Sequence, residues 1–336
     1  MDDRLRRYYE KLLASHMKDP REDHLYSAGQ LSKWFMEKRI PPEEVINLHI
    51  STVRKLVPDL PPEVTHSFNL LLEVMVGYGL AYRDREHLMD LHRELENEIE
   101  VAVGMQQTLL PSAPPDPPGL EIGVLSVAAR QMNGDYYNFV DHGNGLLGVA
   151  VADIIGKGIP AALCMSMIKY AMDRYDDQAL SPSEILRGLN TVVERNVDPS
   201  MFITMIYGVY DTLNHEFRYA TAGHEPGLHY SAAEDGFRDL ETKGLILGVL
   251  RHVDYPEFTV RLDPGDAIIL FSDGVTECRL ENGDFLERDT LIAVIREQID
   301  LPAQQAVEAI HQRLYEMSGY RIRDDQTILL IKRSTD

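Results

Sequence analysis

A proline-rich stretch, PSAPPDPPG at residues 111–119, divides the chain into two parts with different periodicity. Proline has no backbone N–H and fixes φ, so this stretch can neither continue a helix nor enter a central strand. Before it, apolar residues recur at helical spacing, and after it they form short strand-like runs. A chain of 336 residues is also long for one domain. We therefore expect an all-helical part and a second domain that contains strands.

Residues 1–84 are expected to form an N-terminal helical bundle with a regulatory or dimerisation role. Apolar residues keep helical spacing in LYSAGQLSKWFMEKRI and VINLHISTVRKLV. PPEEV and PPEVT each place proline and then glutamate at a helix start, where the missing N–H is harmless and the acid suits the helix dipole. About four helices are predicted, with Trp34 as an anchor of their core.

The last of these helices is predicted to continue beyond Arg83 with a heptad repeat. Its apolar residues lie seven apart in two interleaved rows, Leu88, Leu95, Ala102 and Leu109 in one and Leu91 and Met105 in the other. Glu98 stands in the second row, where a coiled coil needs an apolar residue. Residues 85–118 are thus expected to be a linker helix and a proline-rich hinge, and the repeat favours a homodimer.

Residues 119–336 are expected to form an α+β domain. Strand-like runs such as LLGVAVA and AIILFS come as neighbours along the chain, and helix-like stretches are grouped between them. Ser181, Pro182 and Glu184 have the spacing of a capping box that begins one of these helices. This grouping favours antiparallel sheets with helices outside them.

Composition limits the partners and the compartment. The net charge is −21, whereas binding to nucleic acid phosphates needs clustered Lys and Arg. Cys164 and Cys278 both lie in apolar segments, which is typical of a reduced cytoplasmic protein. The start, MDDRLRRYYE, has no apolar signal-peptide core, and the most apolar window contains Glu73 and is too short for a bilayer. We expect a soluble, cytoplasmic protein that binds neither nucleic acid nor membrane.

An acid and a Gly-Lys-Gly turn follow one of the apolar runs, in VAVADIIGKGIPAAL. A phosphate-cradling loop of the Walker type would need glycine at position 151 and Ser or Thr after Lys157. The sequence has Val151 and Gly158 there, so it does not support nucleotide binding. The question is then why the run ends on Asp153.

A second acid faces Asp153 if the preceding hairpin is regular. The segment GDYYNFVDHGNGLLGVAVAD contains two strand-like runs around turn residues. If the turn centres near Asn144, Asp135 and Asp153 lie equally far from it along the chain and pair across the strands. Like charges directly opposite each other are destabilising unless a cation lies between them. Oxygen ligands of this kind suit a hard divalent ion such as Mg²⁺ or Mn²⁺.

Further acids stand at the ends of two other expected strands. Asp273 follows AIILF, and Asp324 and Asp325 precede TILLI. If these two strands are antiparallel neighbours, the end of one lies beside the start of the other. Each acid alone is also explained as a turn residue beside glycine. Four acids at one sheet end are a stronger indication of a metal site than any one of them.

Five motifs, MNGDYYNF, VADIIGKGIPAAL, TAGHEP, FSDGVTE and RDDQT, occur in this order. As a set they resemble the bacterial metal-dependent protein phosphatases of the PPM (PP2C-like) superfamily, the group that includes the sporulation phosphatase SpoIIE. The resemblance covers about residues 119–333. It implies that the C-terminal domain is a PP2C-like antiparallel β-sandwich flanked by helices.

In that family two Mn²⁺ or Mg²⁺ ions share one bridging acid and activate a water that attacks phosphorus. Carried onto this sequence, the resemblance implies a bridging Asp153, with Asp135 and the carbonyl of Ile154 at the second ion. Asp273 and Asp324 would hold the first ion, in preference to Asp325. The catalytic residues implied are the four metal-binding aspartates, Asp135, Asp153, Asp273 and Asp324.

Two other motif residues have open roles. Lys157 stands in the turn where eukaryotic members often carry a histidine that is assigned as general acid, so that assignment does not transfer. Lys157 is expected to contact either substrate phosphate or solvent. His224 in TAGHEP is either a substrate contact or a structural turn histidine. The phosphate-binding arginine of the eukaryotic enzymes has no clear counterpart.

The resemblance implies a protein serine/threonine phosphatase. PPEEVINLHI, LLLEVMVGYGLAY and CMSMIKYAMD look closer still to members that switch on a general stress response. Their substrate is a phosphorylated anti-sigma-factor antagonist, and a kinase-like activator protein binds their N-terminal domain. One alternative is a catalytically inactive PP2C-fold binding module in a partner-switching pathway, which the loss of metal-binding acids would mark. Another is a metal enzyme that acts on small phosphoesters, for which the N-terminal bundle has no purpose.

Overall fold

The computed structural model describes residues 3–156, 158–175, 180–198 and 201–335. The chain forms two compact units, an N-terminal unit Met1–Glu98 and a C-terminal unit Ile99–Asp336. Helix α4 (Pro62–Gln107) has residues in both units. The division into a regulatory domain, a linker and a phosphatase-like domain at residues 84 and 118 stays a prediction, because compactness alone does not test it.

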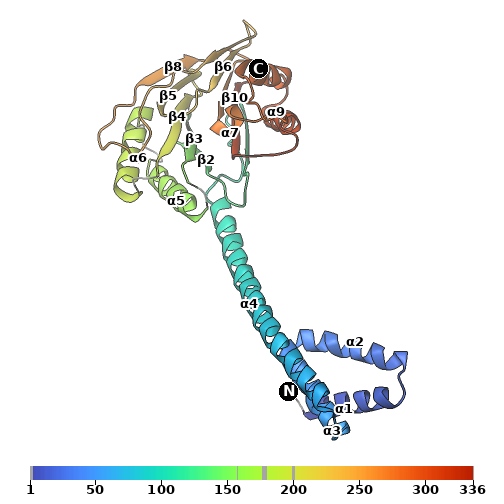
Figure 1. Ribbon diagram of the computed structural model, residues 1–336. Coiled ribbons are helices and arrows are strands. Elements are labelled where there is room, and N and C mark those ends of the chain that lie inside the picture. The colour runs from blue at the N-terminus through green and yellow to red at the C-terminus, as the bar shows by residue number, and fades with distance from the viewer. Residues whose placement is uncertain (1–2, 157, 176–179, 199–200, 336) are drawn as a thin grey trace. The chain divides into compact units, whose positions relative to one another are not determined.

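The N-terminal unit is helical, as predicted. It contains α1 (Asp3–Lys18), α2 (Glu22–Glu37), α3 (Pro42–Leu56) and the first part of α4 (Figure 1). The prolines of PPEEV and PPEVT stand at the starts of α3 and α4, which confirms the predicted helix starts. The core of this unit is formed by buried Leu31, Phe35 and Leu48, with Trp34 packed against them.

Helix α4 continues well past Arg83, which confirms the predicted extension. The heptad residues Leu88, Leu91, Leu95 and Met105 are each more than half exposed. By contrast, Leu109, just beyond the helix end, packs against the core of the C-terminal unit. The apolar rows predicted from the heptad spacing are therefore at the surface over most of the helix.

Two five-stranded antiparallel sheets make up the described part of the C-terminal unit, with helices packed outside them (Figure 1). One sheet has the order β1-β10-β9-β6-β7 and the other has the order β2-β3-β4-β5-β8. The strands are β1 (Leu120–Val127), β2 (Asp135–Asp141), β3 (Leu146–Ile154), β4 (Ile203–Asp211), β5 (Glu216–Ala222), β6 (Leu228–Ser231), β7 (Gly236–Asp239), β8 (Glu257–Arg261), β9 (Ala267–Phe271) and β10 (Gln326–Arg333). The helices are α5 (Ile159–Asp173), α6 (Pro182–Asn196), α7 (Asp273–Thr276), α8 (Arg288–Gln298) and α9 (Ala303–Met317).

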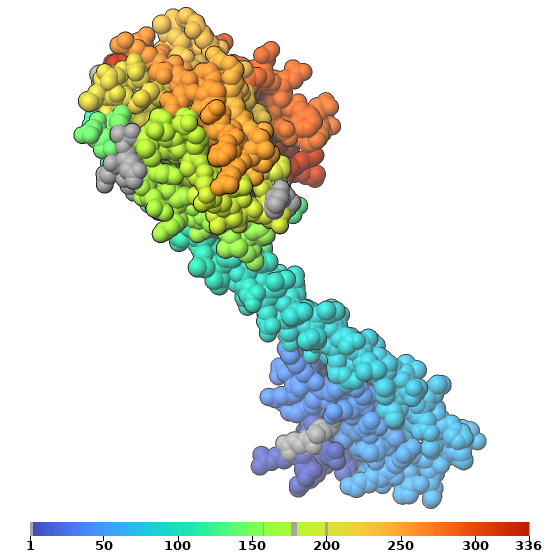
Figure 2. Space-filling view, turned by 90° about the vertical axis from the view of Figure 1, so that its left-hand side faces the viewer, coloured from blue at the N-terminus to red at the C-terminus, as the bar shows by residue number. Residues whose placement is uncertain are grey.

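The central strands are apolar on both faces because each sheet is covered twice. On β3, Val149 and Val151 belong to the core between the two sheets, whereas Ala150 and Ala152 belong to the core beneath α5 and α6. The other sheet is covered in the same way by α8 and α9. Figure 2 shows the outer face on which α5 and α6 lie side by side. Burial on both faces explains why these strands are continuous apolar runs rather than alternating ones.

Most of the predicted elements are present, and the α+β class with its antiparallel sheets is confirmed. The capping box at Ser181 forms as predicted, with Glu184 as its partner. Strands β6, β7 and β8 and helices α7 and α8 were not predicted. β6 and β7 are four residues long and β8 is five, too short for a clear pattern of alternation.

Within the described residues, the helices include none with the length and hydropathy needed to cross a bilayer. Cys164 and Cys278 are both buried and free.

Candidate active site

Asp135 and Asp153 are direct partners across the β2–β3 hairpin. The two strands pair antiparallel with Asp135 opposite Asp153 and Tyr136 opposite Ala152. Asn144, in the turn between them, has a positive φ of 52°. The predicted pairing around Asn144 is thus confirmed. It places two carboxylates side by side at one end of a sheet, where their charges repel.

Asp135 is buried, with 1% of its surface exposed. Its Oδ2 accepts hydrogen bonds from Ser272 Oγ at 2.6 Å and from Thr327 Oγ1 at 2.7 Å. Burial raises the pKa of Asp135 well above its ordinary value, and the negative charges of Asp153 and Asp325 raise it further, against the effect of the two hydroxyl groups. An ionised Asp135 therefore destabilises the fold unless positive charge is brought to it.

Asp273 and Asp324 lie at the adjacent strand ends of the other sheet. β9 and β10 are antiparallel neighbours, and Ser272 N donates to Thr327 O at 3.1 Å just beyond their last pair. Burial, then the charge of Asp324, raises the pKa of Asp273, with smaller effects of the same sign from Glu277 and Glu225. The predicted proximity of these two strand ends is confirmed.

Gly274 explains the glycine of the FSDG motif. A Cβ added at this position would lie 2.1 Å from the carbonyl oxygen of Asp325. Because only glycine permits this approach, the first turn of α7 can lie directly on the backbone of residues 324–325. The contact fixes Asp273, at the start of α7, next to Asp324.

Gly134 lies where the two sheet ends meet. A Cβ added there would lie 3.2 Å from Asp325 Oδ2, 3.5 Å from Ile154 O and 3.6 Å from Asp153 Oδ1. The carbonyl of Ile154 and the carboxylate of Asp153 are therefore close to the same point. This arrangement fits the expectation that both are ligands of one ion.

Asp325 has a different set of contacts. Its Oδ1 accepts from Ala129 N and its Oδ2 accepts from Gly134 N, each at 2.6 Å. Both carboxylate oxygens are thus bonded to the loop that precedes β2. The backbone N–H of Asp325 in turn donates to Asp324 Oδ1 at 3.1 Å, and the preference for Asp324 over Asp325 as a metal ligand stays a prediction.

The acids lie at the ends of two different sheets, rather than at one sheet end as expected, and they do not form a ready cage. Among the residues that the structure describes, no three His, Cys, Asp or Glu side chains already form a group that could hold a metal ion. The chemistry of the donors nevertheless fits a hard divalent cation, because they are carboxylates and a backbone carbonyl. The raised pKa values of Asp135 and Asp273 are a further sign of a site that lacks positive charge.

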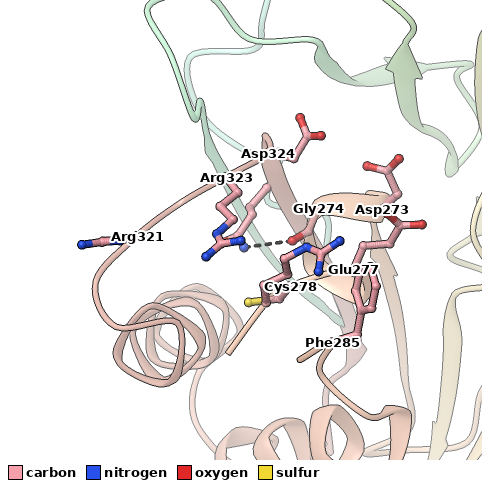
Figure 3. Close-up of a pocket in the computed structure, with 10 residues that line it drawn as sticks. Asp273, Gly274, Glu277, Cys278, Phe285, Arg321, Arg323 and Asp324 are labelled. Carbon is pink, nitrogen blue, oxygen red and sulfur yellow. Dashed lines mark hydrogen bonds between the residues drawn. The ribbon is translucent and has the colours of Figure 1, made fainter. Parts of the chain in front are cut away.

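A cavity of about 220 Å³ opens beside Asp273 and Asp324. It is also lined by Glu277 and by three arginines, Arg279, Arg321 and Arg323. Figure 3 shows Asp273 and Asp324 at its rim and Arg321 pointing away from the other side chains. None of the three arginines was predicted as a site residue, although Arg323 is the first residue of the RDDQT motif; Arg279 and Arg321 lie outside the five motifs.

His224 is buried and bonded to Thr204, whose Oγ1 lies 2.9 Å from His224 Nδ1. Burial lowers the pKa of His224 to about 4, so the ring is neutral at pH 7. Thr204 is in turn the cross-strand partner of Asp153. These contacts favour the structural reading of His224 over the substrate contact. Lys157, the other residue with an open role, lies outside the described residues.

Ser272 and Thr327 were missed as site residues although they lie within FSDG and DDQT. In the sequence, each is a hydroxyl residue within two positions of an aspartate, and this pattern is also common in turns. The junction of β9 and β10 places the two hydroxyl residues side by side, and only the packing of the two sheets brings both hydroxyls to Asp135.

Comparisons with solved structures define the class. The SiaA-PP2C domain of Pseudomonas aeruginosa matches with a TM-score of 0.63 at 20% identity, over 72% of this chain and 98% of that one. The RsbU and RsbW domains of Rv1364c from Mycobacterium tuberculosis match with a TM-score of 0.58 at 25% identity, over 66% of this chain and 62% of that one. The C-terminal unit therefore has the fold of PP2C-type phosphatases, as the motifs indicated.

Sequence comparisons define the family. The SpoIIE family (stage II sporulation protein E) matches residues 143–334, and the N-terminal domain of the phosphoserine phosphatase RsbU matches residues 7–81. Phosphoserine phosphatase RsbU of Bacillus subtilis (strain 168) is 48% identical over 97% of this chain and 96% of its own length. The chain belongs to the RsbU family of phosphoserine phosphatases. It is an enzyme of the protein-serine phosphatase class.

Replacing Asp135 with asparagine should stabilise the protein when no divalent ion is present. Burial raises the pKa of the Asp135 carboxyl group, so keeping this group in the folded protein at pH 7 costs free energy. The substitution removes that cost, and in EDTA at pH 7 we expect the melting temperature to rise by about 3 °C or more. Added Mn²⁺ should raise the melting temperature of the wild type but not that of Asp135→Asn.

The matched control is Asp141→Asn, the same chemical change at the exposed end of β2. It should alter neither the melting temperature in EDTA nor the response to Mn²⁺. A lower melting temperature for Asp135→Asn in EDTA, or a Mn²⁺ response equal to that of the wild type, would contradict the assignment of Asp135.

Proposed function

We propose that catalysis by this phosphatase depends on two Mn²⁺ or Mg²⁺ ions held by the acids at the adjoining ends of the two sheets. The proposed ligands are Asp135, Asp153, the carbonyl of Ile154, Asp273 and Asp324. The observation that carries the proposal is the register pairing of Asp135 with Asp153. Two carboxylates lie opposite each other and one of them is buried. A cation bound between them would offset both the repulsion of their charges and the cost of burial.

Divalent ions, when bound, would lower the pKa of a bound water and supply the positive charge that in-line hydrolysis of a phosphate ester needs. The residues of the chain hold and orient the ligands. Ser272 and Thr327 fix one oxygen of Asp135, and Gly274 places Asp273 beside Asp324. A cysteine nucleophile is not part of this proposal, because Cys164 and Cys278 are buried and burial raises the pKa of each thiol.

The proposed substrate is the phosphoserine form of an anti-sigma-factor antagonist, in a partner-switching pathway that switches on a general stress response. Membership of the RsbU family supports this class of substrate. Arg279 and Arg323, which line the cavity beside Asp273 and Asp324, support an anionic substrate that approaches from this side.

Two alternatives have less support. An inactive binding module of the same fold would have no need to retain all four acids, yet all four are present. An enzyme for small phosphoesters would have no need for an N-terminal unit related to that of RsbU. Comparing Mn²⁺-dependent turnover of a phosphoprotein with that of p-nitrophenyl phosphate separates these readings.

We also propose that the enzyme is cytoplasmic and dimeric, and that a kinase-like activator protein binds its N-terminal domain. The exposed heptad residues of α4 support the dimer, because Leu88, Leu91 and Leu95 are apolar and more than half exposed. Glu98 would weaken the pairing of two such helices. A weak pairing suits an element that a partner protein switches between two arrangements.

Replacing Asp153 with asparagine should abolish Mn²⁺-dependent release of phosphate from a phosphoserine protein. Asp153 is the proposed ligand of both ions, so its loss should leave less than about a tenth of the activity. EDTA should abolish the activity of the wild type, and Mn²⁺ or Mg²⁺ should restore it.

Asp141→Asn, at the other end of the same hairpin, is the control and should keep wild-type turnover. The proposal would be refuted by an Asp153→Asn variant that retains more than about a tenth of the wild-type rate. Full activity of the wild type after exhaustive chelation would refute it as well.

Replacing Glu98 with leucine should raise basal activity in the absence of any partner protein. The change completes the second apolar row of α4 and should strengthen the pairing of two helices. We expect a severalfold higher rate on the phosphoprotein and a higher mass by light scattering at low protein concentration.

Glu100→Leu adds the same apolar surface outside the heptad rows, and it should leave both the rate and the mass unchanged. If Glu98→Leu changes neither the rate nor the mass, α4 is a simple tether between two independent domains. The regulatory reading would then be wrong.

A further inference from the structure

A buried glutamine lies in the last turn of α4. Gln106 is 4% exposed, whereas the next residue, Gln107, is exposed. The Gln106 side chain exchanges two hydrogen bonds with the backbone of Asn133: Nε2 donates to Asn133 O at 2.6 Å, and Oε1 accepts from Asn133 N at 2.9 Å. A side-chain amide thus pairs with both polar groups of one residue in the loop before β2.

The hydrogen bonds continue from Asn133 to Asp135 by two routes. Asn133 Oδ1 accepts from the backbone N–H of Asp135 at 2.9 Å. Asn133 Nδ2 donates to Ser126 Oγ at 2.8 Å, which is 2.8 Å from Thr327 Oγ1, and Thr327 Oγ1 donates to Asp135 Oδ2 at 2.7 Å. The network therefore reaches both the backbone and the carboxylate of Asp135.

The chain that follows α4 makes a second attachment on the other side of Asp135. Tyr137 donates a hydrogen bond from its hydroxyl to the carbonyl oxygen of Pro111 at 3.2 Å. Between the two attachments, Leu109 and Leu110 pack against the core beneath α5 and α6. Residues 106–111 thus contact β2 and its approach two residues before Asp135 and two residues after it.

We propose that Gln106 is a positioning residue for the metal-binding carboxylate of Asp135, and that it couples the end of α4 to the active site. The inference rests on the proposed metal-dependent function. Hydrogen-bonded partners behind a ligand fix its orientation, and their loss typically weakens metal binding about 10- to 100-fold. Any displacement of the end of α4 must either break the two bonds to Asn133 or move the loop that leads into Asp135.

A purely structural role makes a different prediction. If Gln106 only satisfies the backbone of Asn133, its loss leaves the N–H and C=O of Asn133 buried without partners. The free energy of unfolding then falls, and the affinity for Mn²⁺ does not change. If Gln106 positions Asp135, affinity for Mn²⁺ falls in protein that is still folded. Metal affinity, measured apart from stability, separates the two roles.

The test is the binding of Mn²⁺ to the full-length chain, measured by titration calorimetry. Gln106→Met keeps the length of the side chain and removes both hydrogen bonds. We expect its dissociation constant for Mn²⁺ to rise at least about tenfold, and amide hydrogen exchange of Asn133 to accelerate. Gln106→Glu keeps the acceptor for Asn133 N–H and loses the donor to Asn133 O, so its dissociation constant should rise less. This variant replaces Gln106→Met in the test if the methionine variant does not fold.

Gln107→Met makes the same chemical change one residue further on, at an exposed position, and should bind Mn²⁺ as the wild type does. The inference is overturned if folded Gln106→Met or Gln106→Glu binds Mn²⁺ with wild-type affinity, whatever happens to the melting temperature. Failure of the proposed function would look different, because the wild type itself would then neither bind Mn²⁺ nor hydrolyse a phosphoprotein.

Discussion

Repulsion between Asp135 and Asp153 is the constraint on which the rest of the site depends. The register of β2 and β3 places the two carboxylates opposite each other, and the surrounding core leaves Asp135 almost no contact with water. Burial and like charge both disfavour ionised Asp135, which is reflected in its raised pKa. The fold tolerates this arrangement because the large double-sided cores of the C-terminal unit stabilise the sheet end independently.

The two sheets contribute different halves of the site. One supplies Asp135, Asp153 and the carbonyl of Ile154, and the other supplies Asp273 and Asp324 at the junction of β9 and β10. Ser272 and Thr327 join the halves because their hydroxyls bond to Asp135 across the sandwich. A site divided between two sheets is sensitive to small shifts of either one, which agrees with the proposed control by a partner protein.

The sequence was informative wherever a local pattern had one physical explanation. Hairpin geometry around Asn144 predicted the pairing of Asp135 with Asp153, and proline-glutamate pairs predicted where α3 and α4 begin. Contacts between distant segments were beyond such reasoning. Nothing in the spacing of GMQQTLL distinguishes buried Gln106 from exposed Gln107, since only the packing of α4 against residue 133 decides which one is enclosed. The hydroxyl bonds to Asp135 were missed for the same reason.

The central claim is that the adjoining ends of the two sheets hold divalent ions between their carboxylates. Anomalous X-ray scattering from crystals of the full chain grown with Mn²⁺ tests it most directly, because the manganese signal locates the ions without any assumption about activity. The expected result is two manganese peaks, one bonded to Asp153, Asp135 and the Ile154 carbonyl and the other to Asp153, Asp273 and Asp324. Manganese peaks elsewhere on the molecule, with none between Asp135 and Asp153, would contradict the account.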